Sequence, residues 1–90
     1  MPSLNIKVDH SVGLHARPAA EFVKLASAFP CNIQMKNETT ESKFVNAKSI
    51  LGVLTLGVNQ GHIILINAEG EQADEALEAI KQLVESNFGE

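Results

Sequence analysis

The stretch HIILINA, residues 62–68, is apolar at nearly every position. Consecutive apolar residues are typical of a strand that has neighbouring strands on both sides, whereas alternation is typical of a strand with one solvated face. Residues 62–68 are therefore predicted to form an inner strand of a sheet.

Three other segments are predicted to form further strands of the sheet. LNIKVDH (residues 4–10) and NIQMK (32–36) alternate apolar and polar side chains, which predicts strands with one buried face. After the polar connection NETTES (37–42), KFVN (43–46) predicts a short returning strand.

Helical periodicity is clearest in two segments. Residues 72–87 have an apolar stripe formed by Ala73, Ala76, Leu77, Ile80, Leu83 and Val84. Residues 16–28 repeat apolar positions at steps of three and four, and Phe29-Pro30 ends that helix because the residue before a proline is pushed out of the helical region.

The segment AKSILGVLTLG, residues 47–57, fits a short helix, with Asn46 as its N-cap and Gly57 as its stop. The predicted order is β-α-β-β-α-β-α in one domain, residues 1–90. Because the strands alternate, three helices must cover one face of a small sheet, and an α+β fold is expected.

Composition limits the class of protein. The longest apolar run, residues 50–58, is far shorter than the roughly 20 residues that span a bilayer, and the N-terminus lacks the pattern of a signal peptide. Cys31 is the only cysteine, so neither an internal disulfide nor a cysteine-based metal cluster is expected. We expect a cytoplasmic protein without membrane insertion, metal or cofactor.

The net charge of −4 argues against nucleic acid as the main partner, since binding phosphate backbones needs a basic surface. Residues 1–50 hold six basic and four acidic side chains, a net +2, whereas residues 51–90 hold one basic and seven acidic side chains, a net −6. The mildly basic first half could attract an acidic protein surface, although the acidic residues of the second half also suit a solvated helix.

GLHARPAA, residues 13–20, predicts an anion site at a helix start. If the helix begins at Ala16, the backbone amides of Ala16 and Arg17 have no intrahelical partner, and the positive end of the helix dipole adds to them. Arg17 offers a forked donor suited to phosphate oxygens, and Gly13 permits a close approach.

His15 stands at that helix start, and a neutral imidazole is a good nucleophile near pH 7. The sequence shows no nucleotide loop and no metal cluster to complete an enzyme, so this site suits accepting and passing on a phosphoryl group. A histidine and an arginine at a helix start can also be a surface cap without special chemistry.

GLHARPAA resembles the active-site motif of the HPr family, the histidine-containing phosphocarriers of the sugar phosphotransferase system. KSILGVLTLG, residues 48–57, resembles that family's regulatory-serine segment and the short helix after it. Chain length and element order also match, so the resemblance covers nearly the whole chain.

The resemblance implies an open-faced β-sandwich, a four-stranded antiparallel sheet with three helices on one face and the last strand inside the sheet. It implies that His15 is phosphorylated on Nδ1, that Arg17 stabilises the phosphate, and that a kinase modifies Ser49. Enzyme I would donate the phosphoryl group, drawn from phosphoenolpyruvate, and sugar-specific IIA proteins would receive it. An HPr kinase/phosphorylase and a transcriptional regulator are further implied partners of a monomeric carrier.

Two features depart from the commonest family members. Val12 stands where many members carry a small polar residue, and the NETTES connection is a little longer.

Ile50, Leu51 and Leu54 cannot all face inward from a helix of about two turns. An exposed apolar patch beside a basic site indicates a docking surface for a partner, although each residue taken singly could belong to the core.

Other functions remain open on the sequence alone. A metabolite-sensing module would need a pocket, and an acyl-phosphate hydrolase on a related plan would turn over without a partner. An RNA-binding module is disfavoured by the negative charge and by the absence of Tyr and Trp. Within the family, a regulatory paralogue is the alternative to a carrier for sugar uptake.

Overall fold

The computed structural model describes residues 2–89. The chain runs in the order β1 (Ser3–Lys7), α1 (Ala16–Ser27), β2 (Asn32–Asn37), β3 (Val45–Asn46), α2 (Ile50–Thr55), β4 (Ile63–Glu69) and α3 (Ala73–Glu85), followed by a 3-10 helix, η1 (Asn87–Gly89). The predicted β-α-β-β-α-β-α order is confirmed, with η1 added at the end.

The four strands form one antiparallel sheet in the order β1-β4-β2-β3. In its centre, Ile66 of β4 lies opposite Leu4 on one side and Met35 on the other. The prediction that residues 62–68 form an inner strand is therefore confirmed. Only alternate residues of β4 are fully buried, however, and Ile63 is exposed, because the other face of the sheet is open.

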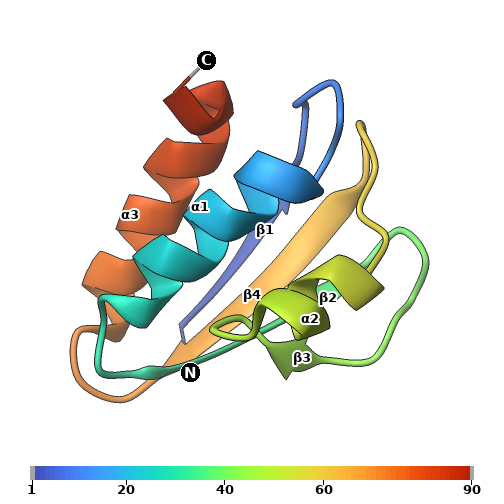
Figure 1. Cartoon of the computed structure of the whole chain (residues 1–90). Coiled ribbons are helices and arrows are strands. Elements are labelled where there is room, and N and C mark those ends of the chain that lie inside the picture. The colour runs from blue at the N-terminus through green and yellow to red at the C-terminus, as the bar shows by residue number, and fades with distance from the viewer. Residues whose placement is uncertain (1, 90) are drawn as a thin grey trace.

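All three helices cover one face of the sheet (Figure 1), so the molecule is an open-faced β-sandwich. The core lies between the two layers, where α1 also packs against α2 and α3. The sheet, the helices and the loops between them all contribute its largest fully buried apolar side chains: Val8, Leu14, Phe22, Ile33, Met35, Val53, Val58, Ile64, Ile66 and Ile80.

Helix α2 begins three residues later than predicted. The backbone amide of Gly52 donates to Ser49 Oγ at 3.1 Å, so Ser49 is the N-cap. Asn46, the predicted N-cap, lies in β3, and its Oδ1 accepts instead from the amide of Lys48 at 2.9 Å. The prediction for Asn46 was wrong because an asparagine can cap a turn as readily as a helix. Gly57 does follow the helix end, with φ +58.

None of the helices within residues 2–89 is long and apolar enough to cross a membrane.

Candidate functional site

His15 is the N-cap of α1, with extended backbone angles (φ −125°, ψ 159°) and a half-buried side chain. Helix α1 starts at Ala16, as the motif predicts, and Pro18 lies buried in its first turn, where a missing N–H costs little. The imidazole therefore stands at the positive end of a helix of 12 residues, a place that favours negative charge.

The loop before His15 is held against the loop after α2. The amide of Leu14 donates to the carbonyl of Val58 at 2.9 Å, and the Leu14 side chain is fully buried. Gly13 has φ +67, and a Cβ there would lie 2.1 Å from the Val58 oxygen. Packing against Val58 therefore requires a glycine at this position, in addition to the predicted approach of an anion.

Ala16 adopts φ +49, in the left-handed region that alanine rarely occupies. A non-glycine residue pays about 1–2 kcal/mol for this conformation. The strain lies immediately after His15, at the first residue of the helix, and no sequence pattern signals it.

Asn59 contacts His15 from 44 residues further along the chain. Asn59 Oδ1 lies 3.2 Å from His15 Nε2. A carbonyl oxygen only accepts hydrogen bonds, so the ring nitrogen must donate, which places the proton of the neutral imidazole on Nε2 and the lone pair on Nδ1. Nothing in the local sequence around Asn59 predicts a contact to position 15.

Arg17 projects from the first turn of α1, in the same turn that His15 caps. Its side chain is about half exposed, and its Nη1 lies 4.0 Å from Glu21 Oε1. An exposed pair of this kind contributes little to stability. The structure thus brings His15, Ala16 and Arg17 together at one helix end.

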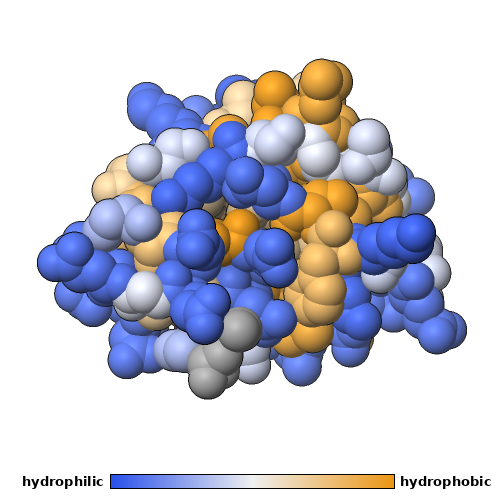
Figure 2. Space-filling model, turned by 90° about the horizontal axis from the view of Figure 1, so that it is seen from below, coloured by the Kyte–Doolittle hydropathy of each residue, from blue (hydrophilic) through white to orange (hydrophobic). Residues whose placement is uncertain are grey.

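Ser49 and the predicted docking residues lie on α2. Ile50, Leu51 and Leu54 are all exposed, and Leu51 most of all, at 73%, whereas Val53 is the buried residue of this helix. We call Ile50, Leu51 and Leu54 the α2 patch. Figure 2 shows the molecule from below, and the largest hydrophobic areas of this face lie on the side where Figure 1 places α2 and β3.

The α2 patch belongs to the same layer as His15. Helices α1 and α2 pack together, and Val58 and Asn59, which contact the 13–15 loop, follow soon after α2. The short helix therefore leads directly into the segment that touches the histidine.

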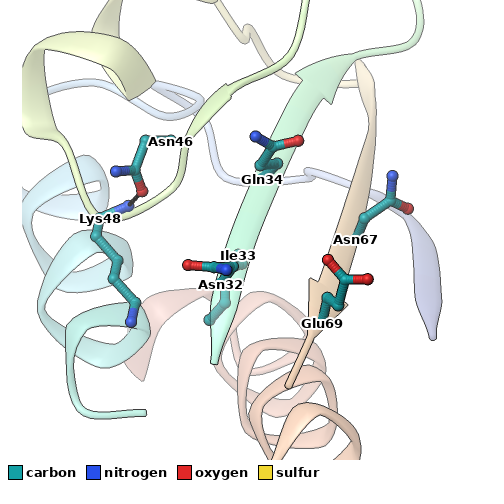
Figure 3. A pocket seen from close by; sticks show the side chains of 7 residues that line it. All are labelled: Asn32, Ile33, Gln34, Asn46, Lys48, Asn67 and Glu69. Atoms are coloured by element: carbon teal, nitrogen blue, oxygen red, sulfur yellow. Dashed lines mark hydrogen bonds between the residues drawn. The ribbon is translucent and has the colours of Figure 1, made fainter. Parts of the chain in front are cut away.

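A separate hollow of about 240 Å³ lies over the ends of β2 and β4 and beside β3 (Figure 3). It is lined by Asn32, Ile33, Gln34, Asn46, Lys48, Asn67 and Glu69. The ammonium of Lys48 donates to the carbonyl of Phe29 at 2.6 Å. No residue of the His15 site lines this hollow. Within residues 2–89, no group of three or more His, Cys, Asp or Glu side chains could hold a metal ion.

An open-faced α+β sandwich that presents a histidine at the first turn of a helix is the architecture of a small phosphocarrier domain. A family model described as the PTS HPr component phosphorylation site matches residues 2–86. The chain belongs to the HPr family and is a phosphocarrier of the phosphotransferase system.

Several known phosphocarriers are similar to this chain over nearly the whole length of both chains. The phosphocarrier protein HPr of Pseudomonas aeruginosa is 39% identical over 90 residues, which is 100% of this chain and 98% of that protein. The crystal structure of HPr-C-His from Thermoanaerobacter tengcongensis gives a TM-score of 0.94 at 46% identity, covering 100% of this chain and 98% of that one. A crystal structure of an HPr dimer from the same organism gives a TM-score of 0.78, with 46% identity and full coverage of both chains.

Proposed function

We propose that His15 accepts a phosphoryl group on Nδ1 from phosphorylated Enzyme I and passes it to sugar-specific IIA proteins. The observation that carries this proposal is the engagement of His15 Nε2 by Asn59, which leaves Nδ1 as the nitrogen with a lone pair. Phosphoenolpyruvate would supply the phosphoryl group to Enzyme I.

The start of α1 would hold the phosphoryl group once it is attached. The helix dipole and the backbone amides of Ala16 and Arg17 favour negative charge there, and the Arg17 guanidinium offers a forked donor that suits the phosphate oxygens. Arg17 thus has its role in transfer and little role in folding.

In this proposal the protein is a stoichiometric carrier, not an enzyme in the strict sense. His15 is changed by each transfer and is restored only when a second protein takes the phosphoryl group.

The α2 patch would dock the partners. Its three exposed apolar side chains fit a partner surface with an apolar centre, and the net charge of +2 over residues 1–50, which end at Ile50 of this patch, would favour acidic surroundings on that partner. Enzyme I and the IIA proteins would use this same surface, since each must reach His15.

Ser49 would be the regulatory site of an HPr kinase/phosphorylase. As the N-cap of α2 it lies directly before Ile50 and Leu51, so a phosphate there places about −1.5 to −2 charges beside the docking patch. The modified form would repel an acidic partner and could serve as a signal to a transcriptional regulator.

We further propose that the protein acts in the cytoplasm as a monomer, within the sugar phosphotransferase system. A dimer of a relative is known, so light scattering at working concentration is the measurement of choice for this point.

The proposal is tested by incubating the protein with phosphoenolpyruvate and Enzyme I and mapping the modified residue under alkaline conditions, in which phosphohistidine survives. His15→Ala should lose all labelling and keep the circular dichroism spectrum of the wild type. Undiminished labelling of a folded His15→Ala protein would refute the assignment.

A further inference from the structure

Asn59 makes a side-chain contact to the imidazole of His15, and its backbone is held by hydrogen bonds to His62. Its backbone amide donates to His62 Nδ1 at 3.1 Å, and its carbonyl accepts from the amide of His62 at 3.0 Å. Both contacts close the tight turn that precedes β4, so the Asn59 side chain projects from a hydrogen-bonded backbone.

The anchor of this turn is buried. Asn37 is fully buried at the end of β2, where its Oδ1 accepts from the amide of Thr40 and its Nδ2 donates to the carbonyl of Leu56. The same Nδ2 lies 3.0 Å from His62 Nδ1. Because Thr40 and Leu56 fix which end of the amide is nitrogen, Asn37 must donate to His62, and His62 Nδ1 must be the acceptor.

A connected path of hydrogen bonds therefore runs from the buried Asn37 through His62 and Asn59 to the imidazole of His15. We propose that Asn59 is a positioning residue for phosphoryl transfer: its Oδ1 holds the His15 ring with the proton on Nε2 and with Nδ1 presented to phosphorus. This inference rests on the proposed role of His15 and adds to it a residue outside the motif.

The same contact would matter more as the reaction proceeds. When the Nδ1 lone pair forms the bond to phosphorus, the bond from phosphorus to the donor breaks and its electron pair leaves with the donor. The ring then carries positive charge while its proton stays on Nε2, so the hydrogen bond to Asn59 Oδ1 becomes charge-assisted and stronger. When the phosphoryl group is passed on, the electron pair of the phosphorus–nitrogen bond returns to Nδ1.

The variants are chosen to leave the turn intact. Asn59→Ala removes the acceptor but keeps both backbone contacts to His62, and Asn59→Asp keeps an acceptor in the same position. Gln60→Ala is the matched control, because Gln60 lies next in the turn and its side chain donates to the carbonyl of Asp9 instead of contacting His15.

The first measurement is the tautomer of neutral His15, read from the imidazole nitrogen-15 shifts of the unphosphorylated protein. The wild type, Asn59→Asp and Gln60→Ala should show the proton on Nε2, and Asn59→Ala should show a mixture of the two tautomers. A wild-type signature in Asn59→Ala would overturn the proposal. This reading needs no phosphoryl transfer, so it is independent of whether His15→Ala loses its label.

The second measurement is the steady-state kinetics of phosphorylation by Enzyme I. Asn59→Ala should lower kcat about fivefold, the worth of one ordinary hydrogen bond, with KM unchanged. Gln60→Ala should match the wild type. An unchanged kcat, or a defect confined to KM, would contradict a positioning role and make Asn59 a structural or docking residue.

Discussion

At the scale of single residues, His15 differs from the other two histidines of the chain in its surroundings. His10 is buried, accepts from the amide of Val12 through Nδ1 and packs edge-on against Phe88, and His62 Nδ1 accepts within the turn before β4. Only His15 of the three stands at the first turn of a helix. The reactivity that we propose for His15 would therefore come from its position.

The strained Ala16 gives a prediction about stability. Glycine pays no steric cost at φ +49, which relieves about 1–2 kcal/mol of strain, but it loses about 0.5–1 kcal/mol more conformational entropy on folding than alanine does. Ala16→Gly should therefore leave the free energy of unfolding unchanged or raise it by up to about 1.5 kcal/mol. Ala20→Gly, at an exposed position inside the same helix, should cost about 1 kcal/mol. Urea unfolding of the two variants makes the comparison, and an equal loss in both would show that Ala16 is not strained.

Much of the site could be predicted at this scale, and the limits have physical reasons. The helix start after His15 follows from local chemistry, because proline and alanine favour it. Asn59 and the strain at Ala16 follow from how a turn 44 residues away packs against the loop, and neither contact leaves a periodic or compositional trace.

At the scale of elements, the local sequence of α2 is compatible with two different N-cap residues. Asn46 and Ser49 are both good capping residues, and only the tertiary structure decides, because Asn46 is paired with Gln34 in β3. The strands were easier, since the alternating pattern fixes which face of each one is buried. The inner place of β4 followed from its continuous apolar run even though its outer face is open.

Ser49→Asp should slow phosphorylation of His15 by Enzyme I at low salt, and added salt should relieve part of the defect. Aspartate still caps α2, so the change adds charge without removing the helix. Ser49→Asn is the matched control, because asparagine has the same shape, caps equally well and carries no charge. Equal initial rates for the two variants at low salt would mean that charge at this position does not govern docking.

Leu51→Glu tests the α2 patch. Because Leu51 is 73% exposed, the substitution should shift the free energy of unfolding by less than about 0.5 kcal/mol. It should raise the Kd for Enzyme I on the order of tenfold, as expected for an apolar residue at the centre of an interface.

Gln82→Glu, at an exposed position of α3, adds the same charge away from the α2 patch and should leave that Kd unchanged. Titration calorimetry gives both values. If Leu51→Glu binds as the wild type does, Enzyme I docks elsewhere.

At the scale of the whole molecule, the two faces of the fold carry different groups of residues. The helical layer carries His15, Arg17, Ser49 and the α2 patch, so one approach of a partner can meet all of them. The open face of the sheet is free of these groups and holds the hollow lined by amide side chains. A carrier that must serve a donor and an acceptor in turn suits this plan, because both partners can use one surface at different times.

The central claim is that the phosphoryl group resides on Nδ1 of His15. Phosphorus–nitrogen coupling in the nitrogen-15-labelled protein, phosphorylated by Enzyme I and phosphoenolpyruvate, measures this directly. The account predicts coupling of phosphorus to Nδ1 of His15, with the Nε2 proton still present. Coupling to Nε2, or phosphorus on any other residue, would contradict it.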